Sequence, residues 1–247
     1  MKKIGWRSNL VLSLLLLSAL IYYIHYLIFR DVHHIFLYLI GDIAFVFLQV
    51  LMVTLFVEKL LEEREKSALL KKLNMVIGAF FSEAGTSLLK MLSSFDPSVC
   101  EIRSDLSIDS NWSKSEFTRV CKQLDSYQYK FHCSREDLVA MKDYLLEKRV
   151  FFLRLLENPN LLEHESFTEL LWAVFHLTDE LAARKDLIKL QESDFNHLLG
   201  DINRVYAALT RQWLSYMDHL RLDYPFLFSF AMRTNPFNPE ATVEITE

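Results

Sequence analysis

Two long apolar runs stand back to back near the N-terminus, and they constrain the fold more than any other feature. They cover residues 10–29 and 35–57 and are separated only by residues 30–34. At a rise of about 1.5 Å per residue, each run makes a helix of roughly 30 Å, which matches the hydrocarbon thickness of a bilayer. Because lipid cannot satisfy backbone polar groups, two such runs with a short loop are predicted to cross a membrane as a transmembrane helical hairpin.

The distribution of basic residues predicts the orientation of this hairpin. Three basic residues precede the first run and five lie between residues 59 and 72, whereas the connecting loop contains only Arg30. Segments rich in Lys and Arg stay on the cytoplasmic side. We therefore expect a multi-pass protein of the cytoplasmic (inner) membrane of a prokaryote, with its N-terminus and C-terminal domain cytoplasmic. The first run is longer than a signal-peptide core and has no small-residue cleavage site, so we expect it to be retained.

The fold class is predicted to be all-α. The whole chain has only five glycines and five prolines, so few residues interrupt long helices. We expect a transmembrane hairpin (1–57), a juxtamembrane helix (58–95), a cytosolic helical bundle (96–233) and a C-terminal tail (234–247). Residues 99–108 and 128–133 have short alternating character and are expected to form extended connectors or one small strand pair.

Local signals predict where the cytosolic helices begin. Three serines are each followed, three residues later, by an acidic residue, which is the pattern of a capping box. These serines predict helices over 113–127, 134–157 and 166–184.

A last long helix, over about 193–222, has apolar residues that recur in steps of four and three. This spacing makes a heptad seam, and its aromatic content is typical of the core of an antiparallel bundle or of a dimer interface. The seam consists of Phe195, Leu199, Ile202, Tyr206, Leu209, Trp213, Tyr216 and Leu220.

Charge limits the range of partners. Four of the 27 basic and two of the 32 acidic residues fall before position 58, so 23 basic and 30 acidic residues follow. The cytosolic part is therefore acidic, and no basic strip follows a phosphate backbone, so nucleic acid is not expected as a partner. The expected partners are the lipid bilayer and either another protein or a second copy of the chain, and no cofactor is expected.

Two polar residues interrupt the apolar runs. In an antiparallel hairpin, His25 and Asp42 lie at similar depth, and an acid inside a membrane span is costly and commonly functional. The pair is interpreted either as a proton-responsive or cation-binding site or as a structural hydrogen bond. In the connecting loop, Asp31, His33 and His34 form a possible outer ion or pH site.

The cytosolic histidines, with many acidic residues nearby, suggest a metal site as one interpretation. A carboxylate-bridged metal site inside a helical bundle normally uses Glu-x-x-His pairs, and the cytosolic helices contain none. The heptad phase places His197 opposite the apolar seam, and His176 with Glu180 forms part of a separate polar stripe. Both stripes are therefore predicted to be solvated helix faces, and no metal is expected.

Three small residues share one side of the juxtamembrane helix: Gly78, Ser82 and Gly85. Each helical glycine costs about 1 kcal/mol relative to alanine, so these positions are expected to serve either close helix packing or a hinge.

Two stretches resemble a family of uncharacterised two-span membrane proteins of bacteria and archaea. They are EKRVFFLRLLENPNLLEHESFTELLWAVFHL at 147–177 and YPFLFSFAMRTNPF at 224–237, and the resemblance extends over most of the chain. It implies two membrane spans with an all-helical cytosolic domain, and it supplies no catalytic residues.

Three functional hypotheses follow from the sequence. The first is a membrane-tethered cytosolic helical interaction or signal-relay module. The second is an oligomeric small transport or channel component that uses His25 and Asp42. The third is a membrane-bound metal enzyme. The chain has no phosphate-binding glycine loop, nucleophile elbow or His-Glu-x-x-His motif, so catalysis is unsupported.

Overall fold

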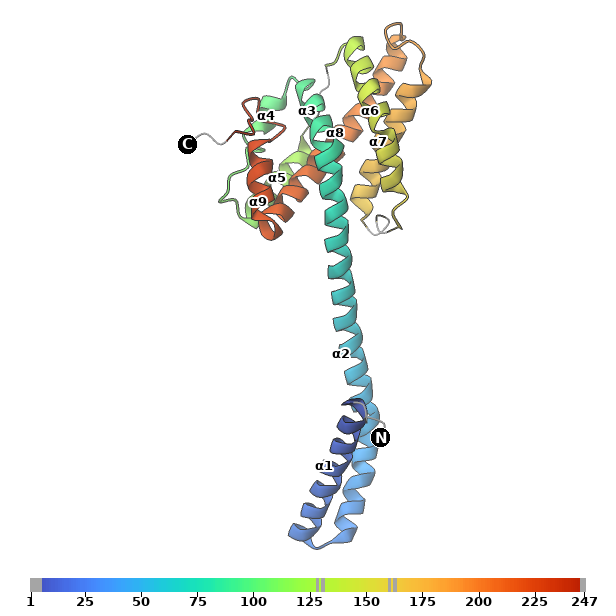
Figure 1. Ribbon diagram of the computed structural model, residues 1–247, viewed down its shortest axis with the longest axis vertical. Helices are drawn as coiled ribbons and strands as arrows, with labels where there is room; N and C mark the ends of the chain where they lie inside the picture. Colours follow the sequence, from blue (N-terminus) through green and yellow to red (C-terminus); the bar gives the residue numbers. More distant parts are fainter. Residues whose placement is uncertain (1–5, 128, 130–131, 160, 162–163, 245–247) are drawn as a thin grey trace. The chain divides into compact units, whose positions relative to one another are not determined.

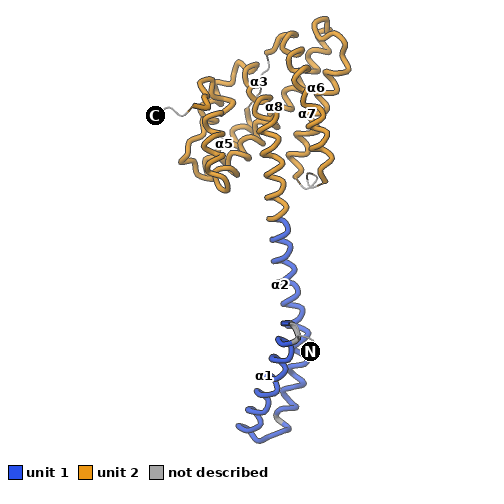
Figure 2. The backbone as a smooth tube through the Cα atoms, viewed as in Figure 1, with its two compact units in different colours: residues 1–66 blue, residues 67–247 orange. Residues whose placement is uncertain are grey.

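All regular structure in the described part of the chain is helical, which confirms the predicted all-α class. The computed structural model describes residues 6–127, 129, 132–159, 161 and 164–244. The chain divides into two compact units (Figure 2), here called the N-terminal unit (Met1–Lys66) and the C-terminal unit (Ser67–Glu247).

The N-terminal unit contains two apolar helices joined by a tight turn. Helix α1 covers Trp6–Phe29, and α2 covers Val32–Phe80 and continues into the C-terminal unit (Figure 1). Arg30 takes the left-handed conformation that the turn requires, with a φ of 49°, and its N–H donates to the carbonyl of Tyr26 at 2.8 Å. The Asp31 carboxylate then accepts the N–H two residues further on, at 2.9 Å, which caps the start of α2.

These helices are long and apolar enough to cross a bilayer. The two candidate membrane spans are Asn9–Phe29 and a stretch within Ile35–Ser94. In each of them, no residue of the most apolar 18-residue stretch is buried inside the protein. The helices that the sequence predicts for the hairpin are therefore present. Most of their apolar side chains are exposed.

The C-terminal unit is a bundle arranged around one long helix. After α2 the chain forms a π-helical turn, η1 (Phe81–Gly85), followed by α3 (Thr86–Ser94), α4 (Val99–Arg103), α5 (Lys114–Ser126), α6 (Arg135–Leu156), α7 (Glu165–Ala183), α8 (Glu192–Asp223) and α9 (Pro225–Arg233). Helix α8 packs against α3, α5, α7 and α9, and α6 packs against α7. In Figure 1, α8 accordingly runs through the middle of this unit.

The heptad seam of α8 lies in the core of this bundle. Five of its residues are buried: Ile202, Tyr206, Leu209, Trp213 and Leu220. The other three seam residues are partly buried and pack against the same core. Of the two interpretations of the seam, the structure therefore supports the bundle core.

Two of the three predicted capping boxes are confirmed, and the third is wrong. Ser113 and Ser134 each form both hydrogen bonds of the box, at the starts of α5 and α6. Ser166 does not cap α7, because the helix already begins at Glu165; its hydroxyl accepts a hydrogen bond from Gln212 of α8 at 2.6 Å. The cap of α7 is His164, whose ring nitrogen accepts a backbone N–H of the first turn at 3.3 Å.

The expectation of an extended connector over residues 99–108 is also wrong, because its first part forms helix α4. The apolar residues Val99, Ile102 and Leu106 are all buried, and their spacing of three and four is the helical period.

The segment expected to be a plain C-terminal tail begins inside the core. Asn235 and Phe237 are 5% and 2% exposed. The Asn235 side-chain amide donates to the carbonyl of Leu106 at 2.8 Å. The Phe237 ring lies edge-on to Trp213, with 5.2 Å between ring centroids. Asn235 and Phe237 therefore hold this segment against Leu106 and Trp213. The expectation of a plain tail from residue 234 onward is wrong for these residues.

Candidate functional site

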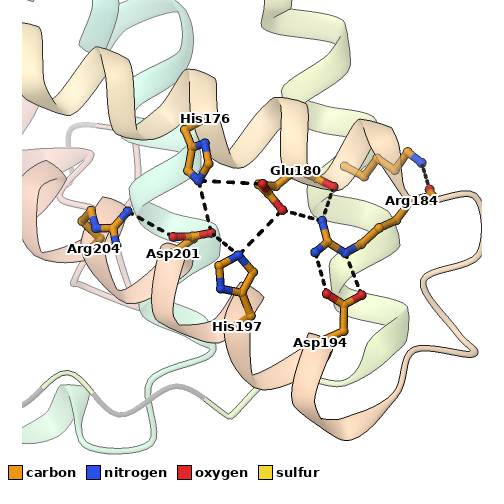
Figure 3. Close-up of polar contacts among 8 residues, drawn as sticks. His176, Glu180, Arg184, Asp194, His197, Asp201 and Arg204 are labelled. Atoms are coloured by element: carbon orange, nitrogen blue, oxygen red, sulfur yellow. Dashed lines mark hydrogen bonds and ion pairs between the residues drawn. The ribbon is translucent and has the colours of Figure 1, made fainter.

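Two polar stripes, one on α7 and one on α8, face each other at the surface of the C-terminal unit. Helix α7 contributes His176 and Glu180, one turn apart, and α8 contributes His197 and Asp201 with the same spacing. Figure 3 shows their side chains converging between the two helices. Because residues four apart lie on one helix face, each helix presents one imidazole and one carboxylate to the other.

These four residues form a closed ring of contacts, which we call the α7–α8 ring. Both imidazole Nε2 atoms lie 3.5 Å from Oδ2 of Asp201. The Glu180 carboxylate faces the same two nitrogens, with its oxygens 3.9 Å from His176 and 3.8 Å from His197. Nitrogen and oxygen donors therefore alternate around a small space.

Asp201 is the buried member of the ring. Its side chain is 5% exposed, whereas those of His176 and His197 are 49% and 56% exposed. Its Oδ1 accepts a hydrogen bond from Arg204 at 3.1 Å. Its Oδ2 points at the two imidazoles, is fully buried and accepts no hydrogen bond from any described residue. A buried carboxylate oxygen without a hydrogen bond is costly, so this arrangement requires an explanation.

An arginine orients the outer side of the ring. Arg184 donates to Oε2 of Glu180 at 2.6 Å and makes two bonds to the Asp194 carboxylate, at 2.6 and 2.9 Å. Hydrogen bonding from this guanidinium lowers the pKa of both carboxyls below their ordinary values. Glu180 therefore stays ionised while its carboxylate remains close to the imidazoles.

The donor set has the chemistry of a metal site. The ligand atoms of Glu180, His197 and Asp201 all lie within 4.8 Å of one another, and His176 contacts the same aspartate oxygen. The sequence correctly predicts that the histidines lie at the surface. It misses that Asp201, four residues after His197, is buried against both imidazoles. The available signal is the pair of patterns His-x-x-x-Glu on α7 and His-x-x-x-Asp on α8.

A second feature of the C-terminal unit is an apolar groove between the end of α2, η1, α8 and α9, which we call the α9 groove. Its volume is about 510 Å³, and its lining includes Met75, Phe81, Leu220, Leu227 and Phe230.

At one wall of this groove, His219 makes polar contacts to two helices. Its Nδ1 lies 3.1 Å from the side-chain amide of Asn74 and 2.8 Å from the carboxylate of Asp223. The contact with Asn74 connects α8 with the end of α2.

Helix α9 presents large apolar side chains beside this groove. Phe228 is buried, whereas Phe226, Leu227 and Phe230 are 72%, 41% and 47% exposed. Only one of the three phenylalanines in this short helix is therefore used in the core.

Two residues of the predicted small-residue stripe, Gly78 and Ser82, line the α9 groove. A Cβ at Gly78 would lie 3.5 Å from the hydroxyl of Tyr216, which is an ordinary contact, whereas a Cβ at Gly85 would lie 2.6 Å from the Phe80 ring. Ser82 belongs to η1 and lines the groove. Gly85 thus has no space for a side chain, and the hinge interpretation stays a prediction.

The predicted polar residues of the hairpin lie in the N-terminal unit. His25 of α1 is partly exposed, and its ring lies 4.7 Å from that of Phe29. Asp42 of α2 is exposed. Their pairing stays a prediction.

In the loop, Asp31 accepts the backbone N–H of His33 and acts as a helix cap. The side chain of His34 lies outside the described residues.

The fold defines an all-helical protein with a small N-terminal helical domain and a larger C-terminal one. A family model described as the N-terminal helical domain of MJ1433 matches residues 2–61. A second, described as the C-terminal helical domain of uncharacterized protein MJ1433, matches residues 69–233.

The chain is also 46% identical over 234 residues to uncharacterized protein MJ1433 of the archaeon Methanocaldococcus jannaschii. The aligned region covers 95% of this chain and 94% of that protein. The protein therefore belongs to the MJ1433 family. No solved structure matches it.

Proposed function

We propose that the protein is a membrane-anchored helical interaction protein whose C-terminal unit self-associates on the cytoplasmic side through the α9 groove. The observation that carries this proposal is the exposed apolar face of α9 beside an apolar groove. Soluble proteins rarely expose a contiguous apolar patch of this kind without a partner.

Two apolar segments in the first part of the chain support membrane anchoring. They have the length and composition of membrane spans, and most of their apolar side chains are exposed. Lipid would remove these side chains from water, at about 25 cal/mol per Å² of apolar area. The basic residues at 59–72 and in the first seven positions favour a cytoplasmic location for both chain ends.

Self-association is favoured because the patch holds both a hollow and a protrusion. Leu227 and Phe230 line the groove, and Phe226, the most exposed of the large apolar residues of α9, lies one turn before Phe230. In a twofold dimer the same patch serves both subunits, so a side chain of one copy enters the groove of the other. A protruding aromatic residue and an adjacent groove meet this requirement within one surface.

The groove also offers a route for signal relay. Phe81 and Ser82 of the π-helical turn contribute to its lining, and this turn directly follows α2. Single-turn π-helical insertions are frequent at functional sites in helices. A partner bound in the groove would therefore contact the end of the helix that begins in the hairpin.

The test is the mass of the full-length protein in mild detergent, measured by light scattering after size-exclusion chromatography. We expect a dimer for the wild type and a monomer for Phe226→Glu and for Phe230→Glu, because a buried unpaired carboxylate opposes association. Val150→Glu is the matched control, since Val150 is also exposed but lies on α6. A wild-type monomer at every concentration, or dimers in both α9 variants, would reject self-association through this groove.

A further inference from the structure

We propose that the α7–α8 ring is a binding site for one divalent first-row transition metal ion, with His176, Glu180, His197 and Asp201 as its ligands. This proposal is independent of self-association and of membrane anchoring. It reverses the sequence-based expectation of a metal-free solvated face.

The distances fit a shared central ion. With metal–nitrogen and metal–oxygen bonds of about 2.0–2.2 Å, two ligands of a tetrahedral ion lie roughly 3.4 Å apart. The two contacts of Asp201 Oδ2 with the imidazole nitrogens are both 3.5 Å. The two contacts of Glu180 come from different oxygens, Oε1 at 3.9 Å from His176 and Oε2 at 3.8 Å from His197, so either oxygen can approach a central ion once the side chain turns toward it.

The same distances do not fit a ring held by hydrogen bonds alone. Charge-assisted N–H···O bonds are normally about 2.7–2.9 Å long. In this ring all four nitrogen–oxygen separations are longer, and Oδ2 of Asp201 accepts no hydrogen bond from the described residues although it is buried. A cation among the four donors would satisfy this oxygen, whereas water-exposed carboxylates elsewhere on the surface have no such need.

The neighbouring arginines keep the ligands oriented. Arg184 bonds Oε2 of Glu180, and Arg204 bonds Oδ1 of Asp201. Outer partners of this kind fix the orientation of metal-binding carboxylates. Each of the two carboxylates is therefore held by an arginine while it also contacts both imidazoles.

The donor types select the class of metal. Magnesium and calcium prefer oxygen ligands, whereas two imidazoles with two carboxylates suit zinc, iron, manganese or cobalt. The exposed edges of His176 and His197 leave solvent access to the ring, so an ion can enter from solution. Because two ligands come from each helix, a bound ion would crosslink α7 to α8.

The test uses full-length protein in detergent, purified without a histidine tag, stripped with chelator and titrated with Zn²⁺ by calorimetry. We expect one equivalent to bind and to raise the melting temperature, since a ligand that binds only the folded state stabilises it. His197→Ala, an exposed position, should fold normally and weaken Zn²⁺ binding at least tenfold. Asp201→Asn should do the same, and His132→Ala, an exposed histidine outside the ring, should bind as the wild type does.

A spectroscopic measurement locates the ion independently of the calorimetric titration. Co²⁺ bound by this donor set should give visible absorption bands that are lost in His197→Ala and retained in His132→Ala. The proposal is overturned if the stripped wild type binds no Zn²⁺. It is equally overturned if His197→Ala binds as tightly as the wild type, because the metal would then lie elsewhere.

Discussion

Replacement of Gly85 by alanine tests the packing of the π-helical turn η1 most directly. Gly85 ends the π-helical turn, and a Cβ there would lie 2.6 Å from Cε1 of Phe80 and 2.8 Å from Cδ1 of Phe81. Both rings are almost fully buried, and Phe80 contacts the rings of Phe152 and Phe167 at 6.3 and 5.3 Å between centroids. Neither ring can move without disturbing the core.

The magnitude follows from two opposing terms. Alanine in place of a helical glycine gains about 1 kcal/mol, whereas overpacking of a filled core costs about 1–3 kcal/mol. We expect Gly85→Ala to be destabilised by about 1 kcal/mol. Gly78→Ala is the matched control, because its Cβ would make an ordinary 3.5 Å contact with Tyr216. This control should instead gain up to about 1 kcal/mol.

The assay is thermal unfolding of the full-length protein and both variants in the same detergent and at the same concentration. For a domain of this size, 1 kcal/mol corresponds to a shift of about 2–4 °C in melting temperature. The two alanine variants should therefore shift in opposite directions. If Gly85→Ala is stabilised as much as Gly78→Ala, the packing argument is refuted.

Three further outcomes are expected. Burial raises the pKa of Asp96 above its ordinary value of 3.8, so the folded state favours the protonated carboxyl. The stability that this protonated form contributes is full below about pH 4 and is lost as the pH rises through the raised pKa. The melting temperature of Asp96→Asn relative to wild type should then increase from pH 4 to pH 7, and a constant difference would count against this. Phe237→Ala should lose about 3–5 kcal/mol, whereas exposed Phe226→Ala should change by less than about 0.5 kcal/mol in the monomer, both measured by thermal unfolding. A tag inserted at Val32 should be accessible from outside intact cells, and a protected tag would contradict the hairpin topology.

Much of the fold is readable from the sequence because its signals are local. The boxes at Ser113 and Ser134 involve residues three apart, so a single sequence contains both partners of each hydrogen bond. The box at Ser166 fails because α7 begins one residue earlier, at Glu165, with His164 as its cap. The Ser166 hydroxyl instead bonds Gln212, which is 46 positions away, and a contact of this range leaves no trace in a local pattern.

The candidate metal ligands show the same limit more strongly. The phase of α8 predicts that His197 lies away from the apolar seam, and the structure agrees, since it is 56% exposed. What a helix phase cannot predict is which other helix lies beside that face. The polar stripe of α7, with His176 and Glu180, occupies this position, and only then does Asp201 become buried between two imidazoles.

Helix α8 connects the two proposed sites. Its first third carries His197 and Asp201 of the ring, and its last third carries Tyr216 and Leu220 of the groove. Between these ends its apolar side is fixed in the core, where Tyr206, like most of the seam, is buried. Because a packed continuous helix does not deform gradually, the two sites need a second arrangement of α8 to influence each other. With α8 fixed in the core in this way, metal binding and self-association are expected to be separate properties of the same helix.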